Sequence, residues 1–364
     1  MIRGLVRLLP EPLQVLARRA YHAARGWPAW TPDAQRTEEQ AAPDDGLVQA
    51  DPAPDPAPPP EPHQSPEAAP AAEEAAEPAQ PRSRSDILLA AIDRSGLGLE
   101  IGPSHSPIAP RRDGFRVEII DHANREQLVE KYRAHGVDVD AIEEVDFIWD
   151  GRGYAELTGR PNGYDWIIAS HVIEHTPDLV GFLRDCEAIL RHGGVLSLAV
   201  PDKRVCFDRM RAMTSIQAVV DAHLEGRANH TEGRVADYFL NVVALDGRIT
   251  WVPNDIAGRS IDALGFVHDT GSARKAMATI RGGVYLDIHA WVFTPSSFRL
   301  LLSDLHLLGL TGLREASFTP GDTEFFVTLS RDGQGPGIDR MELLRRIDSE
   351  QGESILPEAG AHGR

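Results

Sequence analysis

Two apolar runs that each end in a chemically useful residue stand close together near position 100. Leu99-Glu100-Ile101-Gly102 ends at a glycine, and Val117-Glu118-Ile119-Ile120-Asp121 ends at a carboxylate 21 residues after Glu100. A glycine after a strand lets a ligand approach the backbone, and a carboxylate at the tip of the next strand can accept both hydroxyls of a ribose. This pairing is typical of a nucleoside-binding α/β unit. We therefore expect Glu100, Gly102 and Asp121 to bind a cofactor that carries a ribose.

The turn after Gly102 lacks the groups that a dinucleotide needs. A dinucleotide site holds its pyrophosphate on free backbone N–H groups and uses several glycines to do so. Here Pro103, Pro107 and Pro110 remove three such donors, and only Gly102 of the glycine fingerprint remains. S-adenosylmethionine carries a methionine tail in place of the pyrophosphate, and a few carbonyls, amides and a carboxylate such as Glu100 can meet that tail. We therefore expect S-adenosylmethionine as the cofactor.

Candidate catalytic residues follow the fourth and fifth apolar runs of this region. Methyl transfer demands alignment and exclusion of water, and a hydroxyl acceptor also needs a base that takes its proton. His171, His175 and Asp202 are placed to act at the strand ends, and we take them as the catalytic candidates. The alternative for His175 is that it satisfies backbone groups at the start of a helix.

Metal binding is weighed on the same residues. Glu174, His175 and Asp202 form a conceivable set of ligands, but they lack the paired spacing of a strong metal motif, so we expect no metal site. His289 stands beside Trp291, and a packed histidine of the core is as consistent with this position as a functional one.

The elements that must position these residues form an α/β pattern. Its expected parallel strands are 97–101, 117–121, 145–150, 165–170 and 195–200, with a helix over 178–191. Ligands of such sheets bind outside the carboxyl ends of the strands. Gly102, Asp121, Asp150 and Ser170 fall at that edge.

Together these motifs resemble the class I S-adenosylmethionine-dependent methyltransferases, and within them the bacterial methyltransferase-domain proteins linked to surface glycans. The similarity covers residues 85–331 and includes Leu99–Pro103, Asp121, Tyr164–His175, Asp287–Pro295 and Glu324–Val327. It implies a Rossmann-like, mostly parallel sheet with an antiparallel edge hairpin, formed by strands 314–319 and 324–329. It also implies that Asp150 lies near the adenine and that Ser170 and Ser104 contact the cofactor, Ser104 standing where a second glycine is usual.

The rest of the chain divides by composition. Residues 1–30 form a basic amphipathic segment that suggests a peripheral membrane or a protein partner, or a solvated exposed helix. Residues 31–84 are rich in Pro, Ala and acids and predict a disordered tether. Residues 203–290 predict an inserted helical cap over the acceptor, where Arg209 and His223 can bind hydroxyls, and 332–364 predict a loosely held extension.

Charge and cysteine content narrow the function further. A formal charge of −18 argues against nucleic-acid binding, and two cysteines without a disulfide or zinc pattern indicate reduced thiols in a cytoplasmic protein, with the inner face of the membrane as an alternative location. We expect methylation of an oxygen on a small polar molecule or glycan. The alternatives are an NAD(P)-dependent oxidoreductase or epimerase, and a non-catalytic scaffold for a glycosyltransferase.

Overall fold

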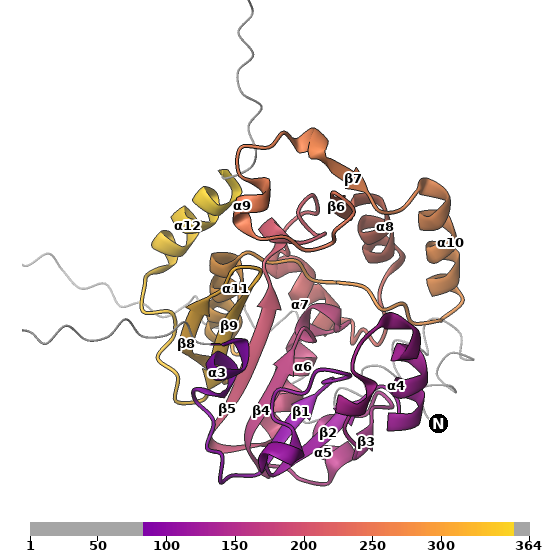
Figure 1. The fold of residues 1–364 in the computed structure, drawn as a ribbon. Helices are drawn as coiled ribbons and strands as arrows, with labels where there is room; N and C mark the ends of the chain where they lie inside the picture. The colour runs from indigo at the N-terminus through magenta and orange to yellow at the C-terminus, as the bar shows by residue number, and fades with distance from the viewer. Residues whose placement is uncertain (1–82, 353–364) are drawn as a thin grey trace, which may run out of the picture. The chain divides into compact units, whose positions relative to one another are not determined.

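A seven-stranded sheet forms the centre of the protein in the computed structural model, which describes residues 83–352 (Figure 1). Its strand order is β3-β2-β1-β4-β5-β9-β8. The strands are β1 (Gly98–Ile101), β2 (Val117–Asp121), β3 (Phe147–Ile148), β4 (Tyr164–Ser170), β5 (Leu190–Pro201), β8 (Arg314–Pro320) and β9 (Glu324–Ser330). The first five strands pair in parallel, whereas β9 runs antiparallel to both β5 and β8. This confirms the expected fold class.

Strand order reverses between β1 and β4, which pair with each other at the centre of the sheet. The chain runs outward from β1 through β2 to β3 and then returns to the other side of β1 as β4. In sheets of this kind the ligand crevice lies at such a reversal, outside the carboxyl ends of the strands. The residues that follow Ile101 and Ser170 are therefore the ones that meet at the site.

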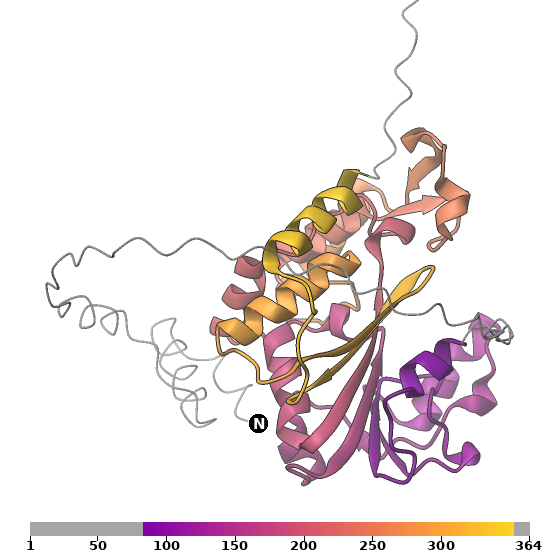
Figure 2. The same cartoon turned by 90° about the vertical axis from the view of Figure 1, so that its left-hand side faces the viewer.

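Each face of the sheet has its own core, because successive strand residues point to opposite sides. On one face Ile167 and Ala169 pack with helices α5 (Tyr154–Thr158), α6 (Leu179–Ile189), α7 (Ile216–Leu224) and α11 (Pro295–Leu307). On the other face Trp166 and Ile168 pack with Leu88 of α3 (Arg84–Leu89) and with the β1–β2 loop. Figure 2 shows α11 and the indigo α3 on opposite sides of the sheet.

Helix α3 begins where the sequence allows a cap. The Ser83 hydroxyl accepts from the Asp86 N–H, and the Asp86 carboxylate accepts from the Ser83 N–H, which together form a capping box. The helix ends at Leu89. Between β1 and β2 only a 3-10 turn, η1 (Arg111–Asp113), is helical, because the prolines remove the N–H groups that a longer helix would use.

The insertion after β5 is not purely helical, which corrects the expected helical cap. It starts with the turn η5 (Lys203–Val205) and α7, which packs against α6 in the core of the sheet. Helices α8 (Glu232–Asn241) and α10 (Thr270–Arg281) pack together around Val235 and Ile280. Between them lie a short helix, α9 (Pro253–Ile256), and an antiparallel pair, β6 (Val243–Leu245) and β7 (Leu264–Phe266).

The C-terminal extension is held firmly over its described part, which corrects the expectation of a loose tail. Helix α12 (Arg340–Gly352) places Leu343 in a fully buried position. Glu350 accepts hydrogen bonds from the N–H and the hydroxyl of Ser296, the second residue of α11. This carboxylate therefore caps free backbone groups at the start of a neighbouring helix.

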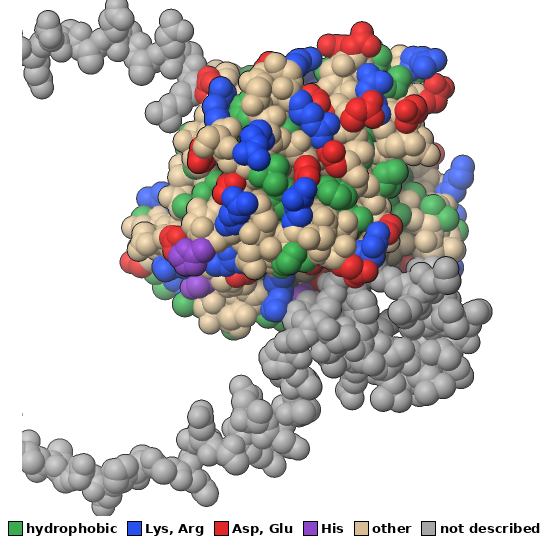
Figure 3. Space-filling model, turned by 90° about the horizontal axis from the view of Figure 1, so that it is seen from below, with side chains coloured by type: hydrophobic (Ala, Val, Ile, Leu, Met, Phe, Trp, Pro, Cys, Tyr) green, Lys and Arg blue, Asp and Glu red, His purple; other side chains and the backbone are tan. Residues whose placement is uncertain are grey.

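The remaining expectations concern the surface and the ends of the chain. Within residues 83–352, no helix is long and apolar enough to cross a membrane. Cys186 and Cys206 are both free and buried, and burial raises the pKa of both thiols. Figure 3 shows basic and acidic side chains interspersed over the face seen from below, without a patch of one sign. The basic segment at 1–30 and the tether lie outside the described residues, apart from the last two positions of the tether.

Candidate functional site

Glu100 ties β1 to the loop that follows it. Its side chain is buried, with Oε1 accepting from the Ile108 N–H at 2.7 Å and Oε2 accepting from the Ala109 N–H at 3.2 Å. Burial raises the pKa of this carboxyl to about 7 although both N–H groups oppose the change. Both carboxylate oxygens are thus used to fix the loop. Direct contact of Glu100 with the cofactor stays a prediction.

Gly102, Ser104 and Asp121 come together at the carboxyl ends of β1 and β2. Gly102 and Ser104 have φ of +64° and +53°, and a Cβ on Gly102 would lie 3.2 Å from Cγ2 of Val172. Asp121 accepts from the Ser104 N–H at 3.1 Å and from the His122 N–H at 2.7 Å. These bonds turn the loop back over the acid at the tip of β2.

The residues at this turn fit the expected cofactor. A carboxylate has about four lone-pair sites, so Asp121, whose Oδ1 also lies 2.6 Å from Nδ1 of His122, keeps acceptor capacity for a ribose hydroxyl beyond its two backbone donors. The Ser104 hydroxyl is buried and has no hydrogen-bond partner in the structure, although the backbone N–H of the same residue donates to this carboxylate. A buried polar atom of this kind calls for a partner that the protein itself does not supply. The loop, Ser104 and Asp121 would hold the ribose end of the ligand.

Asp150 and Ser170 differ from these residues because protein side chains already bind them. Asp150 follows β3, whose Ile148 pairs with Asp121, but its half-exposed carboxylate pairs with Arg152 at 2.8 Å. The Arg152 N–H and guanidinium lower the pKa of Asp150. The Ser170 hydroxyl accepts a hydrogen bond from Arg84 of α3. Their cofactor contacts stay predictions, since both side chains already have protein partners.

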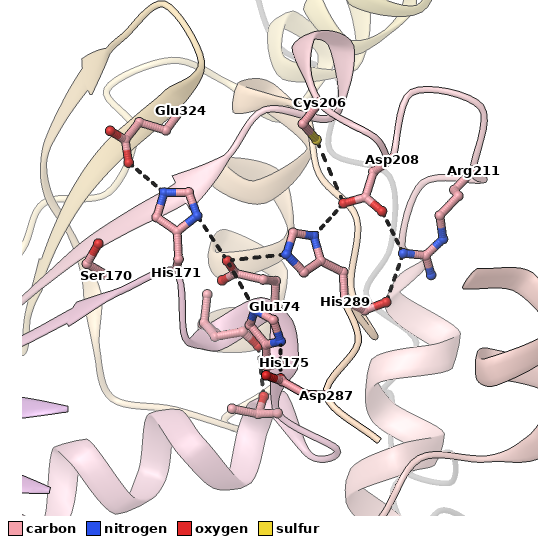
Figure 4. A network of polar contacts seen from close by, with 12 residues as sticks. Ser170, His171, Glu174, His175, Cys206, Asp208, Arg211, Asp287, His289 and Glu324 are labelled. Atoms are coloured by element: carbon pink, nitrogen blue, oxygen red, sulfur yellow. Dashed lines mark hydrogen bonds and ion pairs between the residues drawn. The ribbon is translucent and has the colours of Figure 1, made fainter. Parts of the chain in front are cut away.

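A second group of polar residues follows β4, where the chain makes the turn η4 (Ile173–His175) (Figure 4). His171 has a φ of +53°, which reverses the chain directly after the strand. The turn is clamped by the segment before α11, since the Glu174 carbonyl accepts from the N–H groups of Ala290 at 2.7 Å and Trp291 at 3.1 Å. His171, Glu174, His175 and His289 are thereby brought together, and we call them the Glu174 cluster.

Each histidine of the Glu174 cluster is held by a carboxylate on its outer side. The contacts are His171 Nε2 to Glu324 at 2.8 Å, His175 Nδ1 to Asp287 at 2.8 Å, and His289 Nδ1 to Asp208 at 2.5 Å. Arg211 supports this last contact, because it donates to both Asp208 and the His289 carbonyl. A carboxylate on one ring nitrogen fixes the orientation of an imidazole and leaves the other nitrogen to face the site.

All three inner nitrogens face the same atom, Oε1 of Glu174. The distances are 3.4 Å from His171 Nδ1 and 3.9 Å from both His175 Nε2 and His289 Nε2. Glu174 is completely buried, and neither of its carboxylate oxygens receives a hydrogen bond. The centre of the cluster is therefore a buried carboxylate whose imidazole neighbours lie farther away than hydrogen-bond distance.

The carboxylates decide the charge of His171. Burial lowers the pKa of His171, but Glu174 and Glu324 outweigh burial and raise the pKa to about 9. Burial also raises the pKa of Glu174, yet the surrounding histidines hold it below its ordinary range. At neutral pH His171 is then an imidazolium, which can donate a hydrogen bond but cannot take a proton from an acceptor. This weakens its predicted role as a base.

Asp202 lies outside the Glu174 cluster. Its buried carboxylate accepts from the Arg204 N–H and forms an ion pair with the Arg204 guanidinium at 2.6 Å. No hydrogen bond or ion pair joins it to Glu174 or His175 within residues 83–352. His223, expected to meet the acceptor, is also buried and contacts Asp178 at the start of α6. Both residues therefore stabilise local structure.

Sequence reasoning missed the central position of Glu174 and the supporting carboxylates. The spacing of His171, Glu174 and His175 on one short turn was a usable signal, as was the pairing of Asp287 and His289 two residues apart. Asp208 gave no local signal and Glu324 was marked only by the family resemblance, because both reach the site through the tertiary fold.

The sheet order, the antiparallel β9–β8 edge and the acidic tip of β2 define a Rossmann-like methyltransferase of class I. A model of the family described as "Methyltransferase domain" matches residues 73–305, well over half of the chain. The chain belongs to this family and is an S-adenosylmethionine-dependent methyltransferase, with S-adenosylmethionine as its cofactor. The search of curated proteins found no match.

Solved structures similar to this chain are distant in sequence. A structure titled a putative Zn-dependent alcohol dehydrogenase from Rhodobacter sphaeroides is 15% identical with a TM-score of 0.35, covering 69% of this chain and 91% of its own. The mitomycin 7-O-methyltransferase MmcR is 14% identical with a TM-score of 0.32, covering 68% and 52%. An S-adenosylmethionine-dependent methyltransferase from Mesorhizobium loti is 12% identical with a TM-score of 0.34, covering 67% and 97%. Likeness at this level says nothing about the acceptor.

Proposed function

We propose that this methyltransferase acts on an oxygen of a small polar molecule or glycan. The observation that supports the proposal is the Glu174 cluster, which places imidazoles and a carboxylate at the carboxyl end of β4, beside the turn at Gly102. Val172 lies between the two groups of residues and would touch a Cβ on Gly102. A polar acceptor with hydroxyl groups suits such a lining better than a lipid or a flat aromatic molecule.

Each group of residues then has a separate task. The bound cofactor supplies a methyl group: the acceptor oxygen forms the new C–O bond, the S–C bond breaks with its electron pair left on sulfur, and the acceptor proton is released. The loop fixed by Glu100 and the acid Asp121 hold the cofactor end. His171 is held as an imidazolium between Glu174 and Glu324, so it does not take the acceptor proton. Asp287 and Glu174 raise the pKa of His175 as well, so the proton passes to water.

In this proposal, the insertion between β5 and α11 covers the part of the site where the acceptor binds. It contributes His289 and Asp287 directly to the Glu174 cluster. Figure 1 shows α8, α10 and the β6–β7 pair gathered beyond the end of the sheet to which β5 points. The acceptor would therefore enter between the insertion and the carboxyl ends of the strands.

We also propose that the protein acts in the cytoplasm. Two buried, free cysteines agree with a reducing compartment. Residues 1–30 carry five arginines, at positions 3, 7, 18, 19 and 25, against one acid, Glu11, and would bring the enzyme to an anionic membrane surface or a protein partner. No partner nucleic acid is proposed.

The test has two stages. Titration calorimetry with S-adenosylmethionine and with NAD should show binding of the first only. A panel of hydroxylated small molecules and glycans is then incubated with isotope-labelled cofactor, and the methylated atom is located by NMR. Methyl transfer to nitrogen or carbon would refute the assignment to oxygen, whereas cofactor binding without transfer to any member of the panel would favour the scaffold alternative.

A further inference from the structure

We propose that Glu174, His175 and His289 form a binding site for a divalent transition-metal cation. One potential ligand atom from each of these residues lies within 4.8 Å of the others. The sequence suggested Asp202 as the third member of such a set, but the structure places His289 there and pairs Asp202 with Arg204. The site therefore joins the turn after β4 to the end of the insertion.

The distances at the centre of the site fit an ion better than hydrogen bonds. His175 Nε2 and His289 Nε2 both lie 3.9 Å from Glu174 Oε1. A hydrogen bond between such atoms would be roughly 2.7 to 3.2 Å long. Two ligands that each stand about 2.1 Å from one zinc-like ion can be at most about 4.2 Å apart. The two separations from Oε1 lie within that limit, and the ligand atoms of His175 and His289 lie within 4.8 Å of each other, so the ligands would close slightly around an ion.

The state of the Glu174 carboxylate is the second, independent observation. The residue is fully buried, and both of its oxygens lack a hydrogen-bond partner in the structure. Burial of an ionised carboxylate without partners costs several kcal/mol, and buried charges in proteins are either paired or bound to a metal. His171 lies 3.4 Å from Oε1 and forms only a long ion pair with it, so a cation beside Oε1 supplies the close partner that the carboxylate lacks.

The outer contacts of the two histidines match the pattern that surrounds metal ligands. A ligating histidine nearly always donates its other ring N–H to a carboxylate or carbonyl, which fixes the tautomer. Asp208 is hydrogen-bonded to Nδ1 of His289, and Asp287 lies 2.8 Å from Nδ1 of His175 as an ion pair. Arg211 fixes Asp208 in turn. Both Nε2 atoms are therefore the ones directed at Glu174 (Figure 4).

The ligand types select the kind of ion. Two imidazole nitrogens and one carboxylate suit Zn²⁺ and its neighbours Co²⁺ and Fe²⁺, whereas Mg²⁺ and Ca²⁺ prefer oxygen ligands alone. Three protein ligands also leave a fourth position for water or substrate, as in catalytic zinc sites. In the proposed O-methylation, on which this last step rests, the acceptor hydroxyl would occupy that position and lose its proton more readily.

The experiment uses the full chain, stripped of metals with a chelator and titrated with Co²⁺ and Zn²⁺. Calorimetry should show one equivalent bound, and Co²⁺ should acquire the visible spectrum of a four- or five-coordinate ion with nitrogen ligands. No binding, or the spectrum of hydrated Co²⁺, would overturn the proposal on the wild-type protein alone. Neither readout involves methyl transfer. The experiment can therefore refute the metal site without refuting the proposed O-methylation, and a failure of O-methylation would leave the metal site untouched.

Variants locate the site. Glu174→Gln and His289→Gln should each weaken Co²⁺ binding by more than the roughly 10- to 100-fold typical of losing an outer partner. His192→Gln removes an exposed imidazole at the start of β5 and should bind Co²⁺ like the wild type. Retained binding of S-adenosylmethionine shows that each variant is folded. Unchanged Co²⁺ affinity in Glu174→Gln or His289→Gln would place the ion elsewhere and refute the site.

Discussion

Glu100→Gln should remove a specific pH dependence of stability. Burial raises the pKa of Glu100 from its ordinary value of 4.5 to about 7. Between pH 4.5 and 7 the folded protein therefore keeps a proton on Glu100 that the unfolded chain has lost. The stability that this group contributes is fully present below pH 4.5 and is lost as the pH rises to 7. This rise in pKa corresponds to a loss of about 3 kcal/mol in the free energy of unfolding. Glutamine has no charge to bury and should not show this loss.

The measurement is the free energy of unfolding by urea at several pH values between 5 and 8. The difference between wild type and Glu100→Gln isolates this residue, since histidines and other acids titrate in both proteins. The variant loses one acceptor for the N–H groups of Ile108 and Ala109, which should cost it about 1 to 3 kcal/mol at pH 5. Glu126→Gln, at an exposed position in α4 (Arg125–Tyr132), should keep the wild-type slope. Equal slopes in wild type and Glu100→Gln would refute the reasoning.

Three further predictions concern other parts of the chain. Asp121→Ala should weaken S-adenosylmethionine binding at least about ten-fold, because charged hydrogen bonds contribute about 1.5 to 3 kcal/mol each; unchanged calorimetric affinity with an intact fold would exclude Asp121 as the ribose ligand. Deletion of residues 1–81 should leave Tm and cofactor affinity nearly unchanged, since that composition cannot form a core; a large fall in Tm would show that it belongs to the fold. Leu343→Ala should cost about 2 to 5 kcal/mol because this side chain of α12 is fully buried, and a urea midpoint equal to that of the wild type would show that α12 does not stabilise the domain.

The sheet could be predicted because its signals are local. Apolar runs that end in Gly102, Asp121 and Ser170 mark strands and their carboxyl ends, and Ser83 with Asp86 marks a helix start. The β6–β7 pair could not be predicted, since strands of three residues are too short to show an alternating pattern. The sequence of helix α12 is mostly polar, because the helix buries little besides Leu343. Its packing against the domain could therefore not be predicted.

The site was predictable only in part for the same reason. The turn at Gly102 and the acid at Asp121 lie within one α/β unit, where spacing along the chain carries the information. The Glu174 cluster draws its supporting residues from distant segments, and no sequence spacing relates them. His171, for example, meets Glu324 across 153 residues of chain. Such contacts are consequences of topology, and a single sequence reveals topology only through its local elements.

The position of β9 has a consequence for the newly made chain. β5, a strand of twelve residues, lies between β4 and β9, although β9 is synthesised more than a hundred residues after it. Until Glu324–Ser330 has left the ribosome, the outer edge of β5 has no strand to pair with, and its apolar side chains remain available to other chains. Arrest of translation within the insertion would therefore produce a fragment with an open apolar edge, and chaperone demand should be greatest during that interval.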